Sequence, residues 1–117
     1  NNPVLNISRS MPDMVYEVTR QRCGALSIVD DDGKLLGLVT DHDIRSVLEH
    51  GRDIFSLSIA EIMNGNPTFV ESEAMAVEAL KIMENRDRPF VVLPVLASHD
   101  KEVVGMIHLH DLIANGL

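Results

Sequence analysis

The sequence predicts an α+β fold in which two copies of one small unit pack face to face with pseudo-two-fold symmetry. Segments of the first half recur in the second half in the same order, which indicates an internal duplication. The matched pairs are Asn2-Pro3-Val4-Leu5 with Asn66-Pro67-Thr68-Phe69, Leu26-Ser27-Ile28-Val29 with Leu93-Pro94-Val95-Leu96, Gly37-Leu38-Val39 with Gly105-Met106-Ile107, and His42-Asp43-Ile44 with His110-Asp111-Leu112. Because neither half is large enough to bury its own sheet, we expect the halves to cover each other and to leave a cleft between them.

The first copy opens with a short segment led by proline, residues 3–7, and continues into a helix. Apolar residues between Met11 and Val18 recur at helical spacing behind this segment. Two strand-like runs, 25–29 and 35–40, follow, and a polar turn over residues 30–33 that ends in glycine joins them as a hairpin. A second helix is expected to begin directly after the second strand.

The second copy follows the same plan. Its opening segment spans residues 67–70, and Ser72 is expected to cap the helix behind it. The strand-like runs of this copy are 90–96 and 103–108. Methionines at helical spacing in both copies are interpreted as core residues rather than as a metal or cofactor site.

A short linker separates the two copies. Ser58-Ile59-Ala60-Glu61 has the spacing of a capping box that opens a short helix, and Asn64-Gly65-Asn66-Pro67 ends that helix. We therefore expect three regions, which are a first repeat over residues 1–57, a linker over 58–66 and a second repeat over 67–117.

Composition limits the class of protein. The chain has 117 residues, 45% of them hydrophobic and 24% charged, which is ordinary globular usage and excludes a disordered chain. A formal net charge of −8 and 3% aromatic residues argue against a nucleic-acid partner. No apolar run is long enough for a membrane span, and the single cysteine cannot form an internal disulfide, so we expect a cytoplasmic protein. The absence of a starting methionine suggests a piece of a longer chain.

The junction between strand 35–40 and the following helix carries a recognisable motif. Residues 37–43, Gly-Leu-Val-Thr-Asp-His-Asp, resemble the nucleotide-binding signature of CBS (cystathionine β-synthase) domains. These domains come as tandem pairs of two β-α-β-β-α units, and the repeat agrees with that arrangement across the whole chain. The resemblance implies that Thr40 contacts a phosphate and that Asp43 accepts hydrogen bonds from both hydroxyls of a ribose.

The end of the chain carries a narrower resemblance. Residues 104–112, Val-Gly-Met-Ile-His-Leu-His-Asp-Leu, followed by Asn-Gly-Leu at 115–117, are similar to the C-terminal CBS pair of arabinose-5-phosphate isomerases. Those enzymes supply the precursor of the sugar acid Kdo for lipopolysaccharide or capsule. The resemblance implies a regulatory, non-catalytic role for this chain and a catalytic sugar-isomerase (SIS) domain that precedes it. It also implies a homodimer formed through the CBS helices and a nucleotide-type ligand, either AMP, ATP or the nucleotide-sugar CMP-Kdo.

Candidate ligand-binding residues follow from the two copies of the motif. They are Gly37, Thr40 and Asp43 in the first copy and His108, His110 and Asp111 in the second. Because His108 stands where the first copy has threonine, the two sites are chemically unequal, and contact through an imidazole would depend on pH. The few cations that could face an anion are Arg45, Arg86, Arg88 and Lys101. A monophosphate or a nucleotide-sugar therefore suits the chain better than a polyphosphate.

Other interpretations of the same residues stay open at this point. The spacing of Thr40 and Asp43 is also that of a capping box, so both residues can serve only to begin a helix. In that case the chain is an assembly module that binds no ligand. A metal site would use His108, His110 and Asp111, together with His42 and Asp43 of the first copy, but the spacing secures only two ligands. Cys23 lies at a helix end without an evident base, which argues against nucleophilic catalysis.

Overall fold

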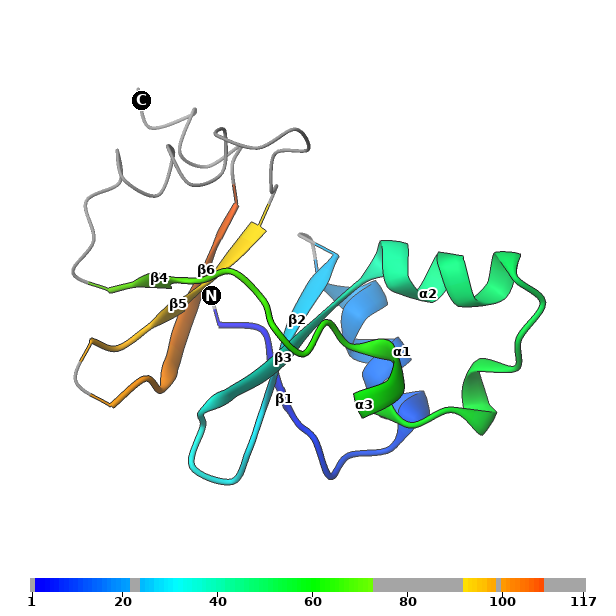
Figure 1. The fold of residues 1–117 in the computed structure, drawn as a ribbon, viewed down its shortest axis with the longest axis horizontal. Coiled ribbons are helices and arrows are strands. Elements are labelled where there is room, and N and C mark those ends of the chain that lie inside the picture. Colours follow the sequence, from blue (N-terminus) through cyan, green and yellow to red (C-terminus); the bar gives the residue numbers. More distant parts are fainter. Residues whose placement is uncertain (1, 22–23, 73–91, 99, 109–117) are drawn as a thin grey trace. The chain divides into compact units, whose positions relative to one another are not determined.

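The computed structural model describes residues 2–21, 24–72, 92–98 and 100–108. The chain divides into two compact units, Pro3–Pro67 and Thr68–Leu117, and Asn1–Asn2 group with the second of them. Each unit contains a three-stranded sheet (Figure 1). The predicted second-copy helices and the residues Cys23, Arg86, Arg88, His110 and Asp111 lie outside the described residues. Within the described ranges, no helix is long and apolar enough to cross a membrane.

The sheet of the first unit has the order β1-β2-β3, where β1 is Val4–Asn6, β2 is Ala25–Val29 and β3 is Leu35–Thr40. The bounds of β2 and β3 are those predicted from the sequence. β2 and β3 form an antiparallel hairpin, whereas β1 pairs with β2 in parallel. A parallel pair needs a crossover, which the helix α1, Met11–Arg20, supplies.

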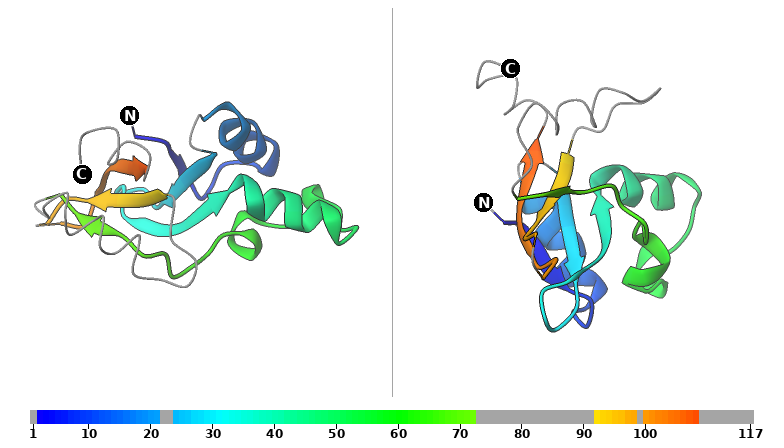
Figure 2. Two further views of the ribbon diagram at one scale, coloured as in Figure 1. Left: turned by 90° about the horizontal axis from the view of Figure 1, so that it is seen from above. Right: turned by 60° about the vertical axis from the view of Figure 1, so that its left-hand side comes forward.

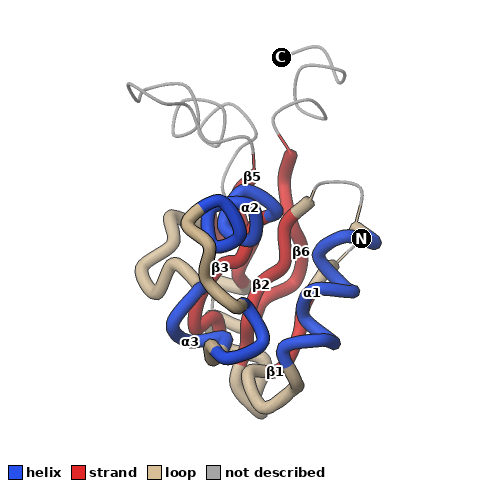
Figure 3. The backbone as a smooth tube through the Cα atoms, turned by 90° about the vertical axis from the view of Figure 1, so that its right-hand side faces the viewer, coloured by secondary structure: helices blue, strands red, loops and turns tan. Residues whose placement is uncertain are grey.

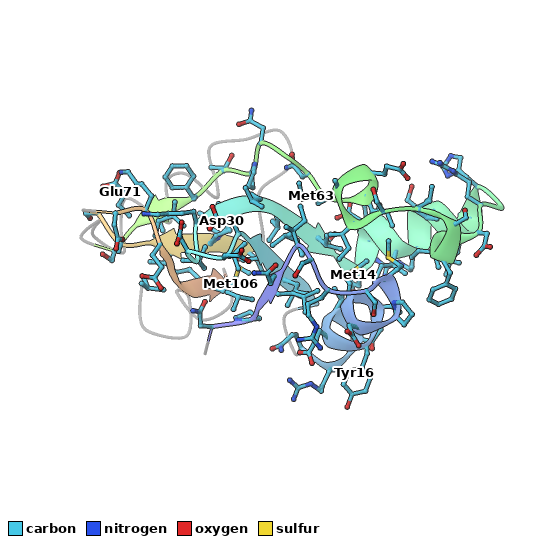
Figure 4. The ribbon with its side chains drawn as sticks, turned by 90° about the horizontal axis from the view of Figure 1, so that it is seen from below. Met14, Tyr16, Asp30, Met63, Glu71 and Met106 are labelled. Carbon is cyan, nitrogen blue, oxygen red and sulfur yellow. The ribbon has the colours of Figure 1, made fainter. Side chains whose placement is uncertain are left out.

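Local signals explain how α1 begins and which face it buries. Ser10 caps the helix, since its hydroxyl accepts a hydrogen bond of 3.2 Å from the N–H of Asp13. A proline in the first turn costs nothing, because the first N–H groups of a helix have no partner within it. Met14 and Val18 are fully buried, while Tyr16 points away from the helix into open space (Figure 4). The prediction that the methionines of this helix belong to the core is confirmed.

The helix α2, Asp41–Glu49, starts where β3 ends, with no loop between them (Figure 2). α1 and α2 lie on one face of the sheet (Figure 3). A 3-10 turn at Ile54–Ser56 and the short helix α3, Ile59–Ile62, complete the first unit. The residues buried between these elements are Leu5, Met11, Met14, Val18, Leu26, Ile28, Val39, Ile44, Ile54 and Ile59.

The sheet of the second unit repeats the topology of the first. Its order is β4-β5-β6, with β4 at Val70–Glu71, β5 at Val92–Leu96 and β6 at Val103–His108. Again the first pair is parallel and the second antiparallel. The register of both hairpins shifts at the same place, between Ile28 and Val29 in one and between Val95 and Leu96 in the other. This shared irregularity supports the duplication independently of sequence similarity.

Strand pairing corrects one detail of the predicted repeat. The sequence match aligns Leu5 of the first copy with Phe69 of the second. In the structure, Leu5 pairs with Ile28, and the residue that pairs with the matched Val95 is Val70. Val70, rather than Phe69, is therefore the structural equivalent of Leu5. Leu5 and Val70 are 5% and 4% exposed, whereas Phe69 is 39% exposed. The second copy therefore has one extra residue between its proline and its first strand, because the position facing the core must be apolar and buried.

Candidate functional site

Thr40 and Asp43 meet at the first turn of α2 and form a complete capping box. The hydroxyl of Thr40 accepts a hydrogen bond of 3.3 Å from the N–H of Asp43. In return, Oδ2 of Asp43 accepts hydrogen bonds from the N–H of Thr40 at 2.8 Å and from its hydroxyl at 3.1 Å. Thr40 is extended, with φ −120° and ψ 165°, as a residue that precedes a helix should be. The capping interpretation of this motif is confirmed.

The capping box leaves part of the Asp43 carboxylate available. All hydrogen bonds that Asp43 makes as an acceptor within the described ranges use Oδ2. Its Oδ1 remains, and the residue is only half-buried. A carboxylate oxygen has room for two hydrogen bonds, so Oδ1 can accept from two neighbouring hydroxyls without breaking the cap. Capping and ligand contact are thus compatible at this residue.

The backbone at the start of α2 offers few donors to an anion. The N–H of Asp41 donates to the carbonyl oxygen of Gly24 at 2.8 Å, and the N–H of Asp43 is used by Thr40. Among the residues that the structure describes, no hydrogen bond is made by the N–H of His42. This donor lies at the positive end of the helix dipole, where a single anionic group is favoured.

Gly24 lies against the side chain of Asp41 at the start of α2, a contact that the sequence analysis missed. Its φ of +63° is a left-handed conformation that favours glycine. A Cβ atom at this position would lie 2.9 Å from Oδ2 of Asp41 and 3.0 Å from its Cγ. The Asp41 carboxylate therefore lies directly over Gly24. A glycine between a helix and a buried strand was the one signal in the sequence that could have indicated this close approach.

The charges around the site are mostly negative. Asp41 and Asp43 both lie in the first turn of α2, and Arg45 is paired with Asp41, with Nη1 and Oδ2 3.4 Å apart. In the other unit, Lys101 is bound by Glu71, and the hydrogen bond and positive charge of Lys101 lower the pKa of the Glu71 carboxyl. Two of the four cations considered from the sequence are therefore already engaged by carboxylates.

Gly37 does not join Thr40 and Asp43. It lies opposite Ile28 on β2, whereas Thr40 lies opposite Ala25, so the two positions project on opposite faces of the sheet. A Cβ at Gly37 would lie 2.4 Å from Sδ of Met63 and 2.9 Å from the carbonyl oxygen of Asn64. The structure gives Gly37 a packing role, in which it admits the linker against β3.

The second copy of the site is described only in part. His108 ends β6 opposite Val92, just as Thr40 ends β3 opposite Ala25, so the predicted correspondence between His108 and Thr40 holds in the backbone. His110 and Asp111 lie outside the described residues. Elsewhere in the chain, within the described ranges, no group of three His, Cys, Asp or Glu residues is placed to hold a metal ion.

Comparison with known proteins agrees with this architecture. The chain is similar to arabinose 5-phosphate isomerase KdsD of Escherichia coli strain K12, with 34% identity over 115 residues, which is 98% of this chain. The chain spans about a third of that relative's length, 34%.

Solved structures show the same fold. The CBS domain pair of protein MJ0100, in complex with 5′-methylthioadenosine and S-adenosyl-L-methionine, has a TM-score of 0.81 and 22% identity, over 98% of this chain and 87% of the other. CBSX2 of Arabidopsis thaliana in complex with AMP has a TM-score of 0.78 and 20% identity, over 96% and 84% of the two chains. The family model described as the CBS domain matches residues 1–50 and 59–116. The chain belongs to the CBS domain family and forms a tandem CBS pair.

Proposed function

We propose that this CBS pair is the regulatory part of a cytoplasmic arabinose 5-phosphate isomerase and that it senses a nucleotide or a nucleotide-sugar. Similarity to KdsD over 98% of the chain supports the parent enzyme. In this proposal the chain has no catalytic role, and the catalytic SIS domain precedes it in the full-length protein. Binding would change the activity of that domain only as far as the ligand prefers one state of the pair over another.

The first repeat supplies the better-defined half of the proposed site. Thr40 and the N–H of His42 would contact a phosphate, and Oδ1 of Asp43 would accept hydrogen bonds from ribose hydroxyls. Gly37 contributes indirectly, because it lets the linker close against the strand that carries Thr40. The observation that carries this proposal is the oxygen of Asp43 that remains after the capping box is complete.

The charge around Thr40 favours a ligand with few phosphates. Asp41 and Asp43 together outweigh Arg45, and a polyphosphate would add charge of the same sign. AMP is bound by CBSX2, and 5′-methylthioadenosine by MJ0100, so ligands with one phosphate or none occur among proteins of this fold. We expect AMP or CMP-Kdo to bind more tightly than ATP. In the second repeat His108, His110 and Asp111 would form an unequal counterpart of the site.

A ligand-free assembly module is the second candidate function. It is favoured by the completeness of the capping box, which accounts for Thr40 and for Oδ2 of Asp43 without any ligand. In that case the pair would serve to hold two copies of the parent enzyme together as a homodimer through its helices. The two candidate functions predict different effects of a substitution at Asp43. Nucleotide binding is weakened if the pair senses a ligand, and no nucleotide binds at all if it is only an assembly module.

Calorimetry with AMP, ATP and CMP-Kdo tests the proposal, and a second capping box in the linker provides a matched control. There the N–H of Ser58 donates to Oε2 of Glu61 at 3.2 Å, and the N–H of Glu61 donates to Oγ of Ser58 at 3.3 Å. Asp43→Asn keeps one oxygen for the cap but removes the free carboxylate oxygen. Glu61→Gln makes the same chemical change away from the proposed site.

We expect Asp43→Asn to weaken nucleotide binding by about tenfold or more, the value of a hydrogen bond to a charged group, and Glu61→Gln to leave it unchanged. Equal affinity in both variants would remove Asp43 from the site. If none of the three nucleotides gives heat with the unmodified chain, ligand sensing is wrong and the assembly module is the better description.

A further inference from the structure

Asn64 and Gly65 form an exposed Asn-Gly pair in the linker, between α3 and β4 (Figure 1). In such a pair the backbone nitrogen of the glycine can attack the side-chain amide carbon of the asparagine, because glycine has no side chain that hinders the approach. The attack releases ammonia and leaves a five-membered succinimide ring, which water opens. Its success depends on what the attacking nitrogen, the amide oxygen and the leaving nitrogen already contact in the folded chain.

The attacking nitrogen is unhindered. Gly65 is exposed, and a Cβ atom added to it would meet no heavy atom within 4 Å beyond its own chain neighbours. Among the residues that the structure describes, nothing accepts a hydrogen bond from the N–H of Gly65. This nitrogen can therefore lose its proton to a base in solution without first breaking a contact of the fold.

The side-chain amide of Asn64 is held in place by a donor at its oxygen. Oδ1 accepts a hydrogen bond of 3.0 Å from the N–H of Asn66, which keeps the amide group beside the backbone of Gly65. Negative charge develops on Oδ1 when Cγ is attacked, and a donor already aimed at this oxygen stabilises that charge as an oxyanion hole does. Within the described ranges, the leaving nitrogen Nδ2 makes no hydrogen bond.

Asn6 has the same side-chain turn, but its reacting groups are engaged. Its Oδ1 accepts a hydrogen bond of 2.9 Å from the N–H two residues later in the chain, as that of Asn64 does. The nitrogen that would have to attack is that of Ile7, whose N–H donates to the carbonyl oxygen of Val29 at 2.9 Å. The leaving nitrogen donates to Oδ1 of Asp31 at 2.9 Å. Asn6 is therefore a matched site at which the fold opposes the reaction.

The other two asparagines of the described ranges, Asn2 and Asn66, precede proline, whose nitrogen has no proton to lose. We propose that Asn64 is a modification site, at which the chain converts its own asparagine into isoaspartate and aspartate. The nitrogen of Gly65 loses its proton to solvent and bonds to Cγ of Asn64, and the Cγ–Nδ2 bond breaks to release ammonia. Water then attacks Cγ, which gives aspartate, or the main-chain carbonyl carbon, which gives isoaspartate. No electrons are transferred, and water is the co-reactant.

The change occurs where the linker is fixed to the first sheet. The N–H of Leu38 on β3 donates to the carbonyl oxygen of Asn64 at 3.0 Å, and the N–H of Asn64 donates to the carbonyl oxygen of Leu38 at 2.9 Å. In isoaspartate the main chain runs through Cγ, so the former carbonyl group becomes a free carboxylate on a side branch. The chain toward β4 is then longer by one carbon and carries an added negative charge. The connection between the repeats would loosen at the residue that fixes it to β3.

Peptide mapping of the 117-residue chain, incubated at mildly alkaline pH, tests the proposal. Mass spectrometry measures the acid formed at Asn64 and at Asn6, and methylation by a protein isoaspartate methyltransferase detects isoaspartate. Each rate is compared with that of the same site in the chain unfolded in urea, so that the intrinsic difference between glycine and isoleucine cancels.

Two variants sharpen the measurement. Gly65→Ala places a methyl group beside the attacking nitrogen, and the fold accepts it because Gly65 has no left-handed φ and no close neighbour. Asn64→Asp supplies the aspartate product without the extra backbone atom of isoaspartate.

We expect folding to slow the reaction at Asn6 by about tenfold or more, because the Ile7 amide must first give up a backbone hydrogen bond, and to slow it far less at Asn64. Gly65→Ala should slow the reaction at Asn64 alone. In the isoaspartate form the Leu38 amide should exchange about tenfold faster than in the fresh chain, whereas Asn64→Asp should leave it unchanged.

Equal slowing by folding at the two asparagines overturns the proposal. An Asn64 that reacts only in urea also overturns it, because the bridge to Leu38 would then hold the residue too rigidly for the ring to close. An unchanged Leu38 amide in the isoaspartate form would contradict the loosening of the linker. Nucleotide binding enters none of these measurements, so this proposal and the proposed function can fail separately.

Discussion

The central strands of the two repeats, β2 and β5, differ by one backbone N–H group. This difference changes the length of the parallel strand beside each of them, β1 and β4. In the first repeat the N–H of Ser27 donates to the carbonyl oxygen of Pro3 at 2.9 Å, and β1 spans three residues. The matched residue in the second repeat is Pro94, which has no N–H, and β4 spans two residues. A parallel pair this short therefore depends on each individual hydrogen bond.

A second difference lies where the first strand of each repeat meets its hairpin. Asn6 faces Val29, and Glu71 faces the matched Leu96. The amide of Asn6 donates to Oδ1 of Asp31 at 2.9 Å, whereas Glu71 accepts from the ammonium group of Lys101. In both repeats a side chain at the end of the first strand is therefore hydrogen-bonded to a side chain of the hairpin turn. The strand residue is the donor in the first repeat and the acceptor in the second.

The largest loss of stability is expected when Ser27 is replaced by proline, the residue that stands at the matched position 94 of the second repeat. Ser27→Pro removes the hydrogen bond to Pro3 and leaves a carbonyl oxygen of a buried residue unpaired. We expect the free energy of unfolding to fall by about 3 kcal/mol, the upper end for such a loss, because proline also restricts the strand backbone. Denaturant unfolding followed by circular dichroism measures it.

Ser27→Ala is the control for that change. The Ser27 hydroxyl is buried and has no hydrogen-bond partner among the described residues, so its removal should cost little. A large loss in Ser27→Ala would mean that the hydroxyl, rather than the N–H, matters at this position, and the comparison with Pro94 would lose its basis.

An intermediate effect is expected at Gly37, where the linker packs. Gly37→Ala would bring a methyl group against Met63 and against the backbone of Asn64. Overpacking of this kind costs about 1–3 kcal/mol. Calorimetric unfolding should show the loss, and Met63→Ala in the same chain should recover only part of it, because the carbonyl oxygen of Asn64 remains.

Gly105→Ala gives the comparison between the repeats, because Gly105 lies opposite Val95 as Gly37 lies opposite Ile28. If no segment packs against Gly105, this substitution should cost less than Gly37→Ala does. An equal cost would show that a segment packs there.

The smallest effect is expected at the exposed pair of Glu71 and Lys101. Lys101 has a φ of 63°, and asparagine tolerates this conformation, so Lys101→Asn removes the ammonium group while keeping the turn. The pKa of Glu71, which Lys101 holds below the ordinary range of a glutamate, should rise in this variant. An NMR titration of the Glu71 carboxyl measures it, and an unchanged pKa would contradict the role of Lys101.

The sign of the pH dependence follows from the direction of that shift. A carboxyl whose pKa is lower in the folded than in the unfolded chain stabilises the fold above its unfolded pKa. This contribution is lost as the pH falls through the folded pKa of Glu71. Lys101→Asn should therefore flatten the acid end of the stability curve slightly.

Features that depend on neighbouring residues were predicted well from the sequence. The capping boxes at Thr40 and Ser58, the bounds of β2 and β3 and the hairpin turn after Val29 were all confirmed. Each is set by local propensities and by hydrogen bonds that reach at most a few residues along the chain. The 3-10 turn at Ile54–Ser56 was missed, because a single polar-capped turn has no periodicity to detect.

Features that depend on residues far apart in the sequence were either not predicted or were assigned to the wrong position. Gly24 and Asp41 are far apart in sequence, and nothing in either segment indicates that one carboxylate lies over the other residue. The sequence match aligned Leu5 with Phe69, because the Asn-Pro motif that anchors the alignment does not reveal the extra residue between Pro67 and β4. Gly37 was assigned to the ligand site by resemblance, whereas its close contact with Met63 needed coordinates.

The amino-acid order alone determined the duplication, the α+β class and the start of α2 directly after its capping residue Thr40, because these rest on periodicity, repetition and short-range capping. Only the folded chain decided which oxygen of Asp43 stays free, which cations are already paired and which sheet edge the linker covers. These depend on strand register, and a register is set by many weak contacts between segments that the sequence does not place together.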